Sequence, residues 1–157
     1  MGFKEFGGAA ALSYAAEYIT SGEDQLALLV GVDTQVCHGM FQCGAIGLIT
    51  GIGNVLPQPV LKLFELCERS LTGDSKAKRY AYELDDALKT LSTFDEGPDL
   101  VLYYKYLLFL KGDLNYKHHF NSYDSLSPSQ KIFAENHLNL FQNWWDGWEG
   151  KNIIYTE

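Results

Sequence analysis

Two short apolar runs constrain the fold of this chain most strongly. Residues 25–30 and 45–50 are each about as long as a strand and show little alternation of apolar and polar residues. Such runs are typical of strands buried on both faces of a parallel sheet. Residues 2–6 resemble a strand end before the turn at Gly7-Gly8, and helical patterns cover 9–19 and 35–42. The alternation predicts an α/β fold with a parallel sheet.

The remainder of the chain is predicted to be mostly helical. Helical periodicity covers residues 58–71, 75–92, 99–110 and 127–148. Ser127-Pro128-Ser129-Gln130 predicts a capping box at the start of the last helix, and Gly73 and Gly112 predict helix ends. An aromatic stripe on the last helix is expected to be core or oligomer interface. Its members are Phe133, His137, Leu140, Phe141, Trp144 and Trp148.

Composition narrows the class of protein. With 157 residues, 46% of them hydrophobic, the chain holds enough apolar material for one globular core. A net charge of −8 with scattered basic residues argues against nucleic acid as a partner. The apolar runs are too short to span a membrane, and no export signal is seen. The odd set of Cys37, Cys43 and Cys67 lacks metal-ligand spacing and favours a reducing cytoplasm.

The ends of the three expected strands carry the candidate chemistry. Lys4-Glu5, Gly31-Val32-Asp33 and Ile49-Thr50-Gly51 follow the strands in order. In (β/α)8 enzymes the catalytic groups lie at the carboxyl ends of the strands. Three strands cannot close an eight-stranded barrel, and a sheet of three leaves its edges unpaired. We therefore expect the chain to be part of a larger barrel and to be inactive and self-associating alone.

These segments resemble the dihydrodipicolinate synthase and N-acetylneuraminate lyase family. Gly2-Phe3-Lys4-Glu5 resembles the strand end that carries the family's Schiff-base lysine; residues 28–33 and 44–54 resemble the next strand and the last one. The resemblance implies that residues 1–72 are the last three βα units of a TIM barrel and residues 73–157 a helical C-terminal domain. It also implies a homotetramer or dimer that needs no metal or other cofactor.

The resemblance makes Lys4 the catalytic residue of a Schiff-base lyase or synthase acting on a small 2-oxo acid. A lysine buried at a strand end is partly desolvated, which favours the neutral, nucleophilic amine. By resemblance, the main-chain carbonyl of Ile49 orients Lys4, and Gly31, Asp33 and Gly51 contribute to substrate binding. Glu5 points to the opposite face of its strand and receives no catalytic role.

Some residues depart from the family pattern. Gly7 and Gly51 stand where members of the family often have hydroxyl side chains, so fewer hydrogen-bond donors are available to bind a sugar acid. This favours a dehydratase, deaminase or synthase over a sialic-acid lyase. His38, His118 and His119 are assigned surface or packing roles. The aromatic-rich segment 116–157 is longer than expected and has no catalytic explanation.

Two other interpretations remain open. The first is a catalytically silent family member that acts as a binding or regulatory subunit. The second is a mostly helical interaction domain whose motif matches are accidental. By resemblance, the Thr-Thr turn that binds the substrate carboxylate and the proton-relay tyrosine belong to strands before Lys4. The exact substrate and the direction of the reaction are not set by the sequence.

Overall fold

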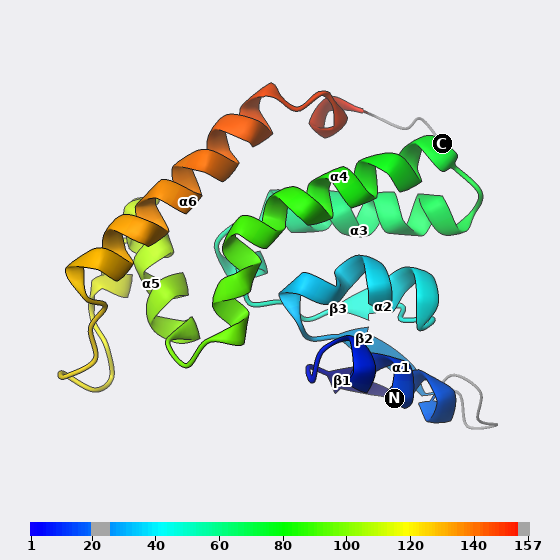
Figure 1. Cartoon of the computed structure of the whole chain (residues 1–157), viewed down its shortest axis with the longest axis horizontal. Coiled ribbons are helices and arrows are strands. Elements are labelled where there is room, and N and C mark those ends of the chain that lie inside the picture. The colour runs from blue at the N-terminus through cyan, green and yellow to red at the C-terminus, as the bar shows by residue number, and fades with distance from the viewer. Residues whose placement is uncertain (20–25, 154–157) are drawn as a thin grey trace.

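A computed structural model describes residues 1–19 and 26–153, apart from the side chains of residues 95 and 96. The chain is mixed α/β, mostly helical with a small parallel sheet (Figure 1). Its strands and α-helices are β1 (Gly2–Glu5), α1 (Ala9–Ile19), β2 (Ala27–Val30), α2 (Val36–Gln42), β3 (Gly47–Leu48), α3 (Pro57–Leu71), α4 (Ser75–Ser92), α5 (Leu100–Leu110) and α6 (Pro128–Gly147). Short 3-10 helices span Asp33–Gln35 (η1), Ile52–Asn54 (η2), Thr93–Glu96 (η3), Leu114–Lys117 (η4) and Glu149–Asn152 (η5).

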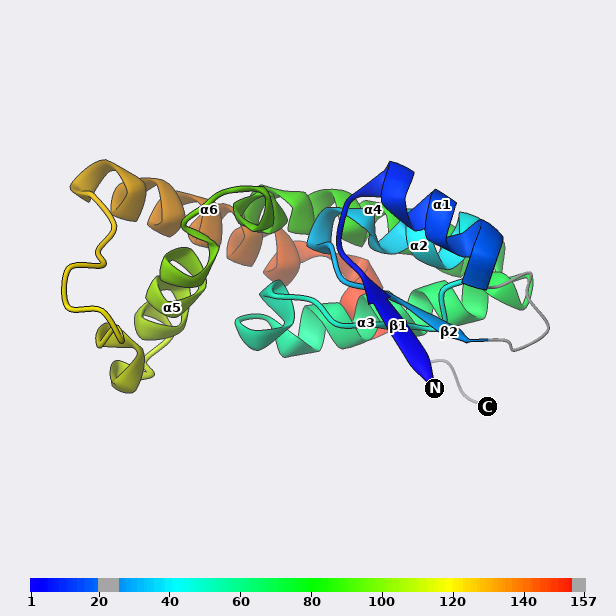
Figure 2. The same ribbon diagram turned by 90° about the horizontal axis from the view of Figure 1, so that it is seen from below.

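The sheet has the order β1-β2-β3, and both pairings are parallel. Lys4 is opposite Leu29, and Val30 is opposite Leu48, so the carboxyl ends of the strands meet at one edge. Helices α1 and α2 connect the strands, and Figure 2 shows β1 and β2 running side by side next to them. The parallel sheet expected from the sequence is confirmed.

The third strand is much shorter than the apolar run at 45–50. β3 comprises two residues, but Ile46 N donates to Leu28 O at 2.9 Å and Ile49 N to Val30 O at 2.8 Å. The flanks of β3 therefore stay aligned with β2. Within the described residues β3 pairs with β2 alone, so the ladder has support on one side only. These three strands do not close a barrel.

The helices form the larger part of the core. α3 and α4 run antiparallel, and α6 lies alongside α4 (Figure 1). The predicted helices agree with the observed ones to within one residue at the ends, because their apolar periodicity was strong. The largest fully buried helical side chains include Leu63, Leu66, Leu84, Leu91, Leu107 and Phe141.

The helix ends follow the sequence signals. Ser127 Oγ accepts from Gln130 N at 3.3 Å, and Gln130 Oε1 accepts from Ser127 N at 2.9 Å, which completes the predicted capping box. Gly73 and Gly112 have φ angles of 100° and 102° just after α3 and α5. Glycine adopts this left-handed conformation without a Cβ penalty, so both helices end there.

One hydrophobic core extends across the expected boundary at residue 72. It joins Leu12 and Leu28, which precede the boundary, to Leu84 and Phe141, which follow it. The boundary falls between α3 and α4, which pack against each other. The two parts therefore share their packing within this chain.

The aromatic stripe on α6 divides between core and surface. Phe141 and Trp148 are buried, whereas Phe133 and Leu140 are exposed. Trp148 Nε1 donates to Glu83 Oε2 at 3.0 Å, which ties the end of α6 to α4. The core role predicted for the stripe holds for the buried members.

The described helices include none long and apolar enough to cross a membrane. The three cysteines are buried and unpaired with one another as disulfides. His38 packs between α1 and α2: its Nε2 lies 3.0 Å from Ser13 Oγ and 3.4 Å from Cys43 Sγ. Within residues 1–19 and 26–153, no group of three or more His, Cys, Asp or Glu side chains is placed to hold a metal ion.

Candidate functional site

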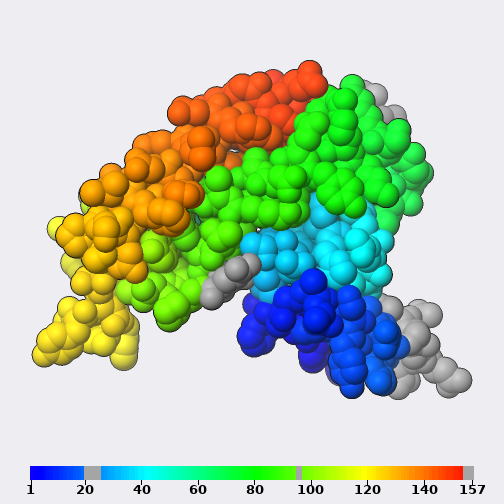
Figure 3. Space-filling model, viewed as in Figure 1, coloured from blue at the N-terminus to red at the C-terminus, as the bar shows by residue number. Residues whose placement is uncertain are grey.

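A cavity of about 530 Å³ lies beside the carboxyl ends of β1 and β2. Its walls come from the turn after β1, the loop after β2 and the first residue of α5. The lining residues are Lys4, Phe6, Gly7, Gly8, Gly31, Val32, Thr34, Gln35 and Leu100. In Figure 3 the surface is hollowed between the N-terminal residues and the α5 end of the molecule. This is the position at which α/β barrels place their chemistry.

Lys4 reaches the cavity by passing directly over Gly31. A Cβ atom on Gly31 would lie 2.4 Å from Lys4 Cε, a distance that real carbon atoms do not reach. Gly31 has no positive φ angle, and its N–H donates to Glu5 O at 2.7 Å. The same Cβ would lie 2.9 Å from the main-chain Glu5 O, so the close approach of the end of β1, and not turn geometry, favours glycine at this position.

The neighbouring carboxylate is engaged in the turn. Glu5 Oε1 accepts from Phe6 N at 2.8 Å and from Gly7 N at 2.7 Å. A Cβ on Gly7 would lie 2.7 Å from Ala11 Cβ and 3.0 Å from Glu5 Oε1, so this packing leaves little room for a side chain. Glu5 therefore stabilises the turn that shapes one wall of the cavity.

The burial expected for Lys4 is not found. Its side chain is exposed, with Nζ 6.0 Å from the centroid of the Phe6 ring. Within the described residues β1 pairs with β2 alone, so its other side has no neighbouring strand. The strand end is consequently open to solvent in this chain.

Asp33 lies in a different environment from the one expected. Its side chain is buried and does not line the cavity. Oδ1 accepts from Gly51 N at 2.8 Å, while Oδ2 accepts from Ile52 N at 2.7 Å and from Tyr104 OH at 2.5 Å. The carboxylate thus ties the loop after β2 to the loop after β3 and to α5.

Gly51 and Ile49 also lie outside the cavity lining. A Cβ on Gly51 would lie 2.4 Å from Cε2 of the Tyr104 ring, so this glycine makes room for the ring that bonds Asp33. Gly51 has an ordinary right-handed φ of −72°. Ile49 is partly exposed and holds β3 to β2 through its N–H. Of the predicted site residues, Lys4 and Gly31 are brought together at the cavity.

Sequence reasoning missed the contributions of α5. Tyr104 holds Asp33, and Leu100 lines the cavity, although both lie far along the chain from the strands. Residues 100–110 are nearly all apolar, so periodicity did not single out either residue. The lining has one cation, Lys4, and no carboxylate, together with the polar Thr34 and Gln35. Such a lining suits a small anionic ligand better than a metal ion.

Comparisons with known proteins bear on the fold. No protein-family model matches the sequence, and no curated protein matches it. A solved structure described as the first monomeric dihydrodipicolinate synthase variant is similar, with a TM-score of 0.71 and 19% sequence identity. The match covers 88% of this chain and 44% of the other, so this chain spans less than half the length of that protein. The described chain therefore has the fold of part of a dihydrodipicolinate synthase.

Proposed function

We propose that this chain contributes the Schiff-base lysine of a lyase or synthase of the dihydrodipicolinate synthase type, acting on a small 2-oxo acid. The observation that carries the proposal is the path of Lys4 over Gly31 into the cavity at the carboxyl edge of the sheet. The fold likeness supports it, because strand ends at this edge carry the chemistry of barrel enzymes.

In the proposed reaction Lys4 Nζ attacks the C2 carbonyl carbon of the oxo acid. A proton leaves the nitrogen, the carbonyl oxygen departs as water, and a protonated imine forms. The imine withdraws electrons, so loss of a proton from C3 gives an enamine that can form a carbon–carbon bond. The same intermediate permits expulsion of a leaving group on the β-carbon, and hydrolysis of the imine restores the amine.

Proton transfer and carboxylate binding are assigned to residues outside this chain. The family resemblance places a Thr-Thr turn and a tyrosine on strands that precede the lysine strand. We propose that such strands pair with the open edge of β1 to complete a barrel, with α3 to α6 belonging to its helical C-terminal part. Completion would also cover Lys4, whose exposure is a property of the open edge.

The proposed substrate is smaller than a sialic acid. Gly7 lines the cavity without a hydroxyl, and its packing leaves little room for one. At Gly51 a serine side chain would collide with the Tyr104 ring. Both positions therefore lack donors for a polyhydroxylated chain, which favours short 2-keto-3-deoxy acids or hydroxylated pyrroline carboxylates.

Borohydride trapping tests the proposal. The complete protein, in which the proposed further strands pair with β1, is incubated with pyruvate and sodium borohydride, and the adduct is measured by intact mass. We expect a single adduct in the wild type and in Lys78→Ala, which replaces an exposed lysine on α4, and none in Lys4→Ala. Equal labelling of wild type and Lys4→Ala would show that Lys4 is not the nucleophile.

A competition experiment tests the substrate class. N-acetylneuraminate should compete with pyruvate for the trapped site more weakly than a 2-keto-3-deoxy acid does. Stronger competition by N-acetylneuraminate would overturn the proposed substrate class.

Assembly and location complete the proposal. We propose that the protein functions in the cytoplasm, in keeping with its three unpaired cysteines, and as a homo-oligomer, as the family resemblance implies. The chain alone presents Phe6, Tyr14 and Tyr18 to solvent beside the sheet. Exposed apolar side chains next to an unpaired strand favour association. Light scattering on the purified chain should give a mass above that of one copy, and a stable single copy would contradict this assignment.

A further inference from the structure

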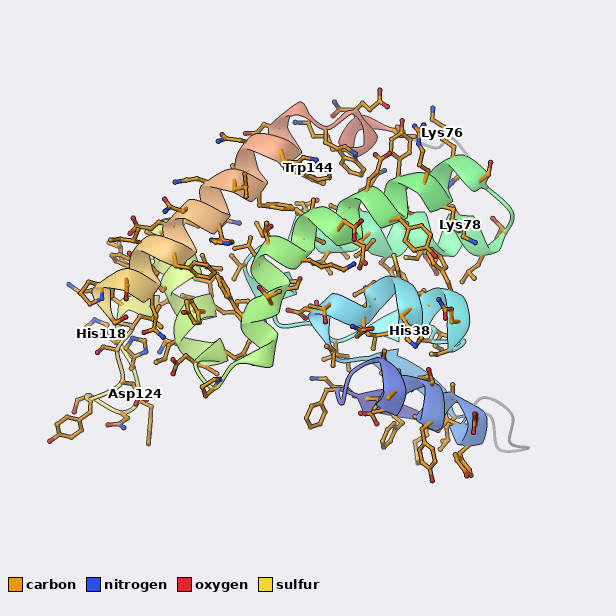
Figure 4. All side chains as sticks on the ribbon, viewed as in Figure 1. His38, Lys76, Lys78, His118, Asp124 and Trp144 are labelled. Atoms are coloured by element: carbon orange, nitrogen blue, oxygen red, sulfur yellow. The ribbon has the colours of Figure 1, made fainter. Side chains whose placement is uncertain are left out.

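A second cavity lies between α5 and the aromatic-rich segment after it, which the proposed reaction does not use. Its volume is about 140 Å³, and it is lined by α5, η4, the loop before α6 and the start of α6. It shares no lining residue with the cavity beside Lys4, although both touch the first turn of α5. Figure 4 places His118 and Asp124 in the segment between α5 and α6.

One wall of this cavity is apolar and aromatic. Leu102, Tyr106 and Phe109 follow one another along one face of α5, and the buried Leu126 adds to the wall. The rings of Tyr106 and Phe109 are stacked, with centroids 6.2 Å apart and planes 22° apart. A dry apolar cavity of about 150 Å³ holds one benzene molecule. This wall therefore has room for a single aromatic ring.

The other side of the cavity carries two cations. Lys117 from η4 and Lys131 from α6 line it beside His119, although the chain as a whole has a net charge of −8. The ion pairs found among the described residues include neither lysine. Lys131 Nζ instead lies 5.8 Å from the centroid of the Tyr106 ring. Two exposed lysines thus line one small cavity whose lining residues include no carboxylate.

The carboxylate of Glu135 is already engaged. Glu135, one turn after Lys131, accepts a hydrogen bond from Tyr106 OH. Burial and this hydrogen bond raise the pKa of Tyr106 to about 12, so the tyrosine remains neutral. Glu135 does not line the cavity. An added anion would therefore meet two lysines and a neutral ring wall.

We infer that this cavity binds a small aromatic carboxylate, with the ring against Tyr106, Phe109 and Leu102 and the carboxylate between Lys117 and Lys131. The apolar wall selects the ring, and the lysines select its negative charge. The site is independent of the chemistry at Lys4.

A fluorine NMR titration of the full chain with 4-fluorobenzoate tests the inference. We expect saturable binding that weakens at least ten-fold in Lys117→Met/Lys131→Met, which removes both charges and keeps an unbranched side chain of similar length. Lys78→Met is the matched control, because Lys78 also lies over an aromatic ring, 5.6 Å from the Phe41 centroid, but is far from the cavity (Figure 4). This control and Lys4→Ala should bind as the wild type does.

Two further probes separate the contribution of the ligand's negative charge to binding from that of its aromatic ring. 4-Fluorobenzyl alcohol and 4-fluorobenzylamine keep the ring without the negative charge, and each should bind at least ten-fold more weakly than 4-fluorobenzoate. Absence of saturable binding, equal binding of the amine, or unchanged binding in the double variant would each overturn the assignment. Because Lys4→Ala is predicted to retain binding, failure of the Schiff-base proposal leaves this test intact.

Discussion

The sheet part of the molecule, residues 1–56, and the helical part, residues 57–153, differ in how far they satisfy their own backbone hydrogen bonds. Helices bond their own backbone groups, so α3, α4 and α6 need only bury apolar faces, and side chains such as Leu66, Leu84 and Phe141 are fully buried. A strand bonds its neighbours, and β1 has a described neighbour on one side only. The helices therefore satisfy their backbone groups within this chain. The candidate chemistry lies at the edge of the sheet where β1 has no described neighbour on one side.

The largest expected effect comes from breaking the helical core. Phe141→Ala should lower the free energy of unfolding by about 4 kcal/mol, because it leaves a large cavity among fully buried side chains. Leu140→Ala, on the exposed side of the same helix, should change it by about 0.5 kcal/mol or less. Urea denaturation measures both. Similar losses would mean that α6 does not pack as described.

The second prediction tests the hydrogen bonds by which Asp33 joins the sheet part to the helical part. Asp33→Ala should cost about 3 kcal/mol, because Gly51 N, Ile52 N and Tyr104 OH lose their common acceptor in a buried position. Asp86→Ala, in an exposed ion pair with Lys89, should cost about 0.5 kcal/mol. Both losses are read from the midpoints of urea unfolding. If Asp33→Ala were as mild as Asp86→Ala, the carboxylate would not hold the loops together.

A smaller effect is expected at the start of α6. Ser127→Ala removes the acceptor for Gln130 N and should cost about 1 kcal/mol, whereas Ser127→Thr keeps a hydroxyl and should recover most of it. The test is the thermal unfolding midpoint. A Thr variant as unstable as the Ala variant would show that the cap contributes through something other than its hydroxyl.

The smallest effect is a pH dependence from Asp85, a buried carboxyl on α4 near Cys37 of α2. Burial raises the pKa of Asp85, although Lys89 lies 3.3 Å away and opposes the shift. Between the ordinary value of about 3.9 and the raised value, the folded state holds a proton that the unfolded state has lost. The contribution of Asp85 to stability is therefore greatest below this window and falls as pH rises through it.

Unfolding titrations of two variants check this sign. The stability of Asp85→Asn relative to the wild type should increase as pH rises through the window, because the amide stays neutral. Asp86→Asn, at an exposed side chain, should follow the wild-type profile more closely. A relative stability of Asp85→Asn that decreases with rising pH would contradict the direction of the shift.

The sequence predicted the parts of the fold that depend on local patterns. Helix ends such as the Ser127 capping box and the Gly112 stop depend on neighbouring residues, and they were found within one residue. β3 is shorter than the run at 45–50 and pairs with β2 alone among the described strands, and the run carries no signal of its pairing partners. An apolar run alone therefore does not set the length of a strand.

The candidate site was predicted only where its residues lie at strand ends. Lys4 and Gly31 meet at the cavity because β1 and β2 are parallel neighbours in register. The burial of Asp33 and the need for glycine at position 51 both depend on Tyr104, whose hydroxyl reaches Asp33 across 71 positions of sequence. No local pattern reports a contact of that separation.

The most direct test of the account is to locate the trapped adduct in the complete protein, in which the proposed further strands pair with β1, with its wild-type sequence. After reaction with pyruvate and borohydride, the protein is digested and the modified lysine is identified by tandem mass spectrometry, without any substitution that could alter the fold. We predict that the modification lies on Lys4 and that the other lysines remain unlabelled at the same pyruvate concentration. Labelling spread over the exposed lysines, or concentrated on a lysine of the helical part, would contradict the assignment of the chemistry to the sheet edge.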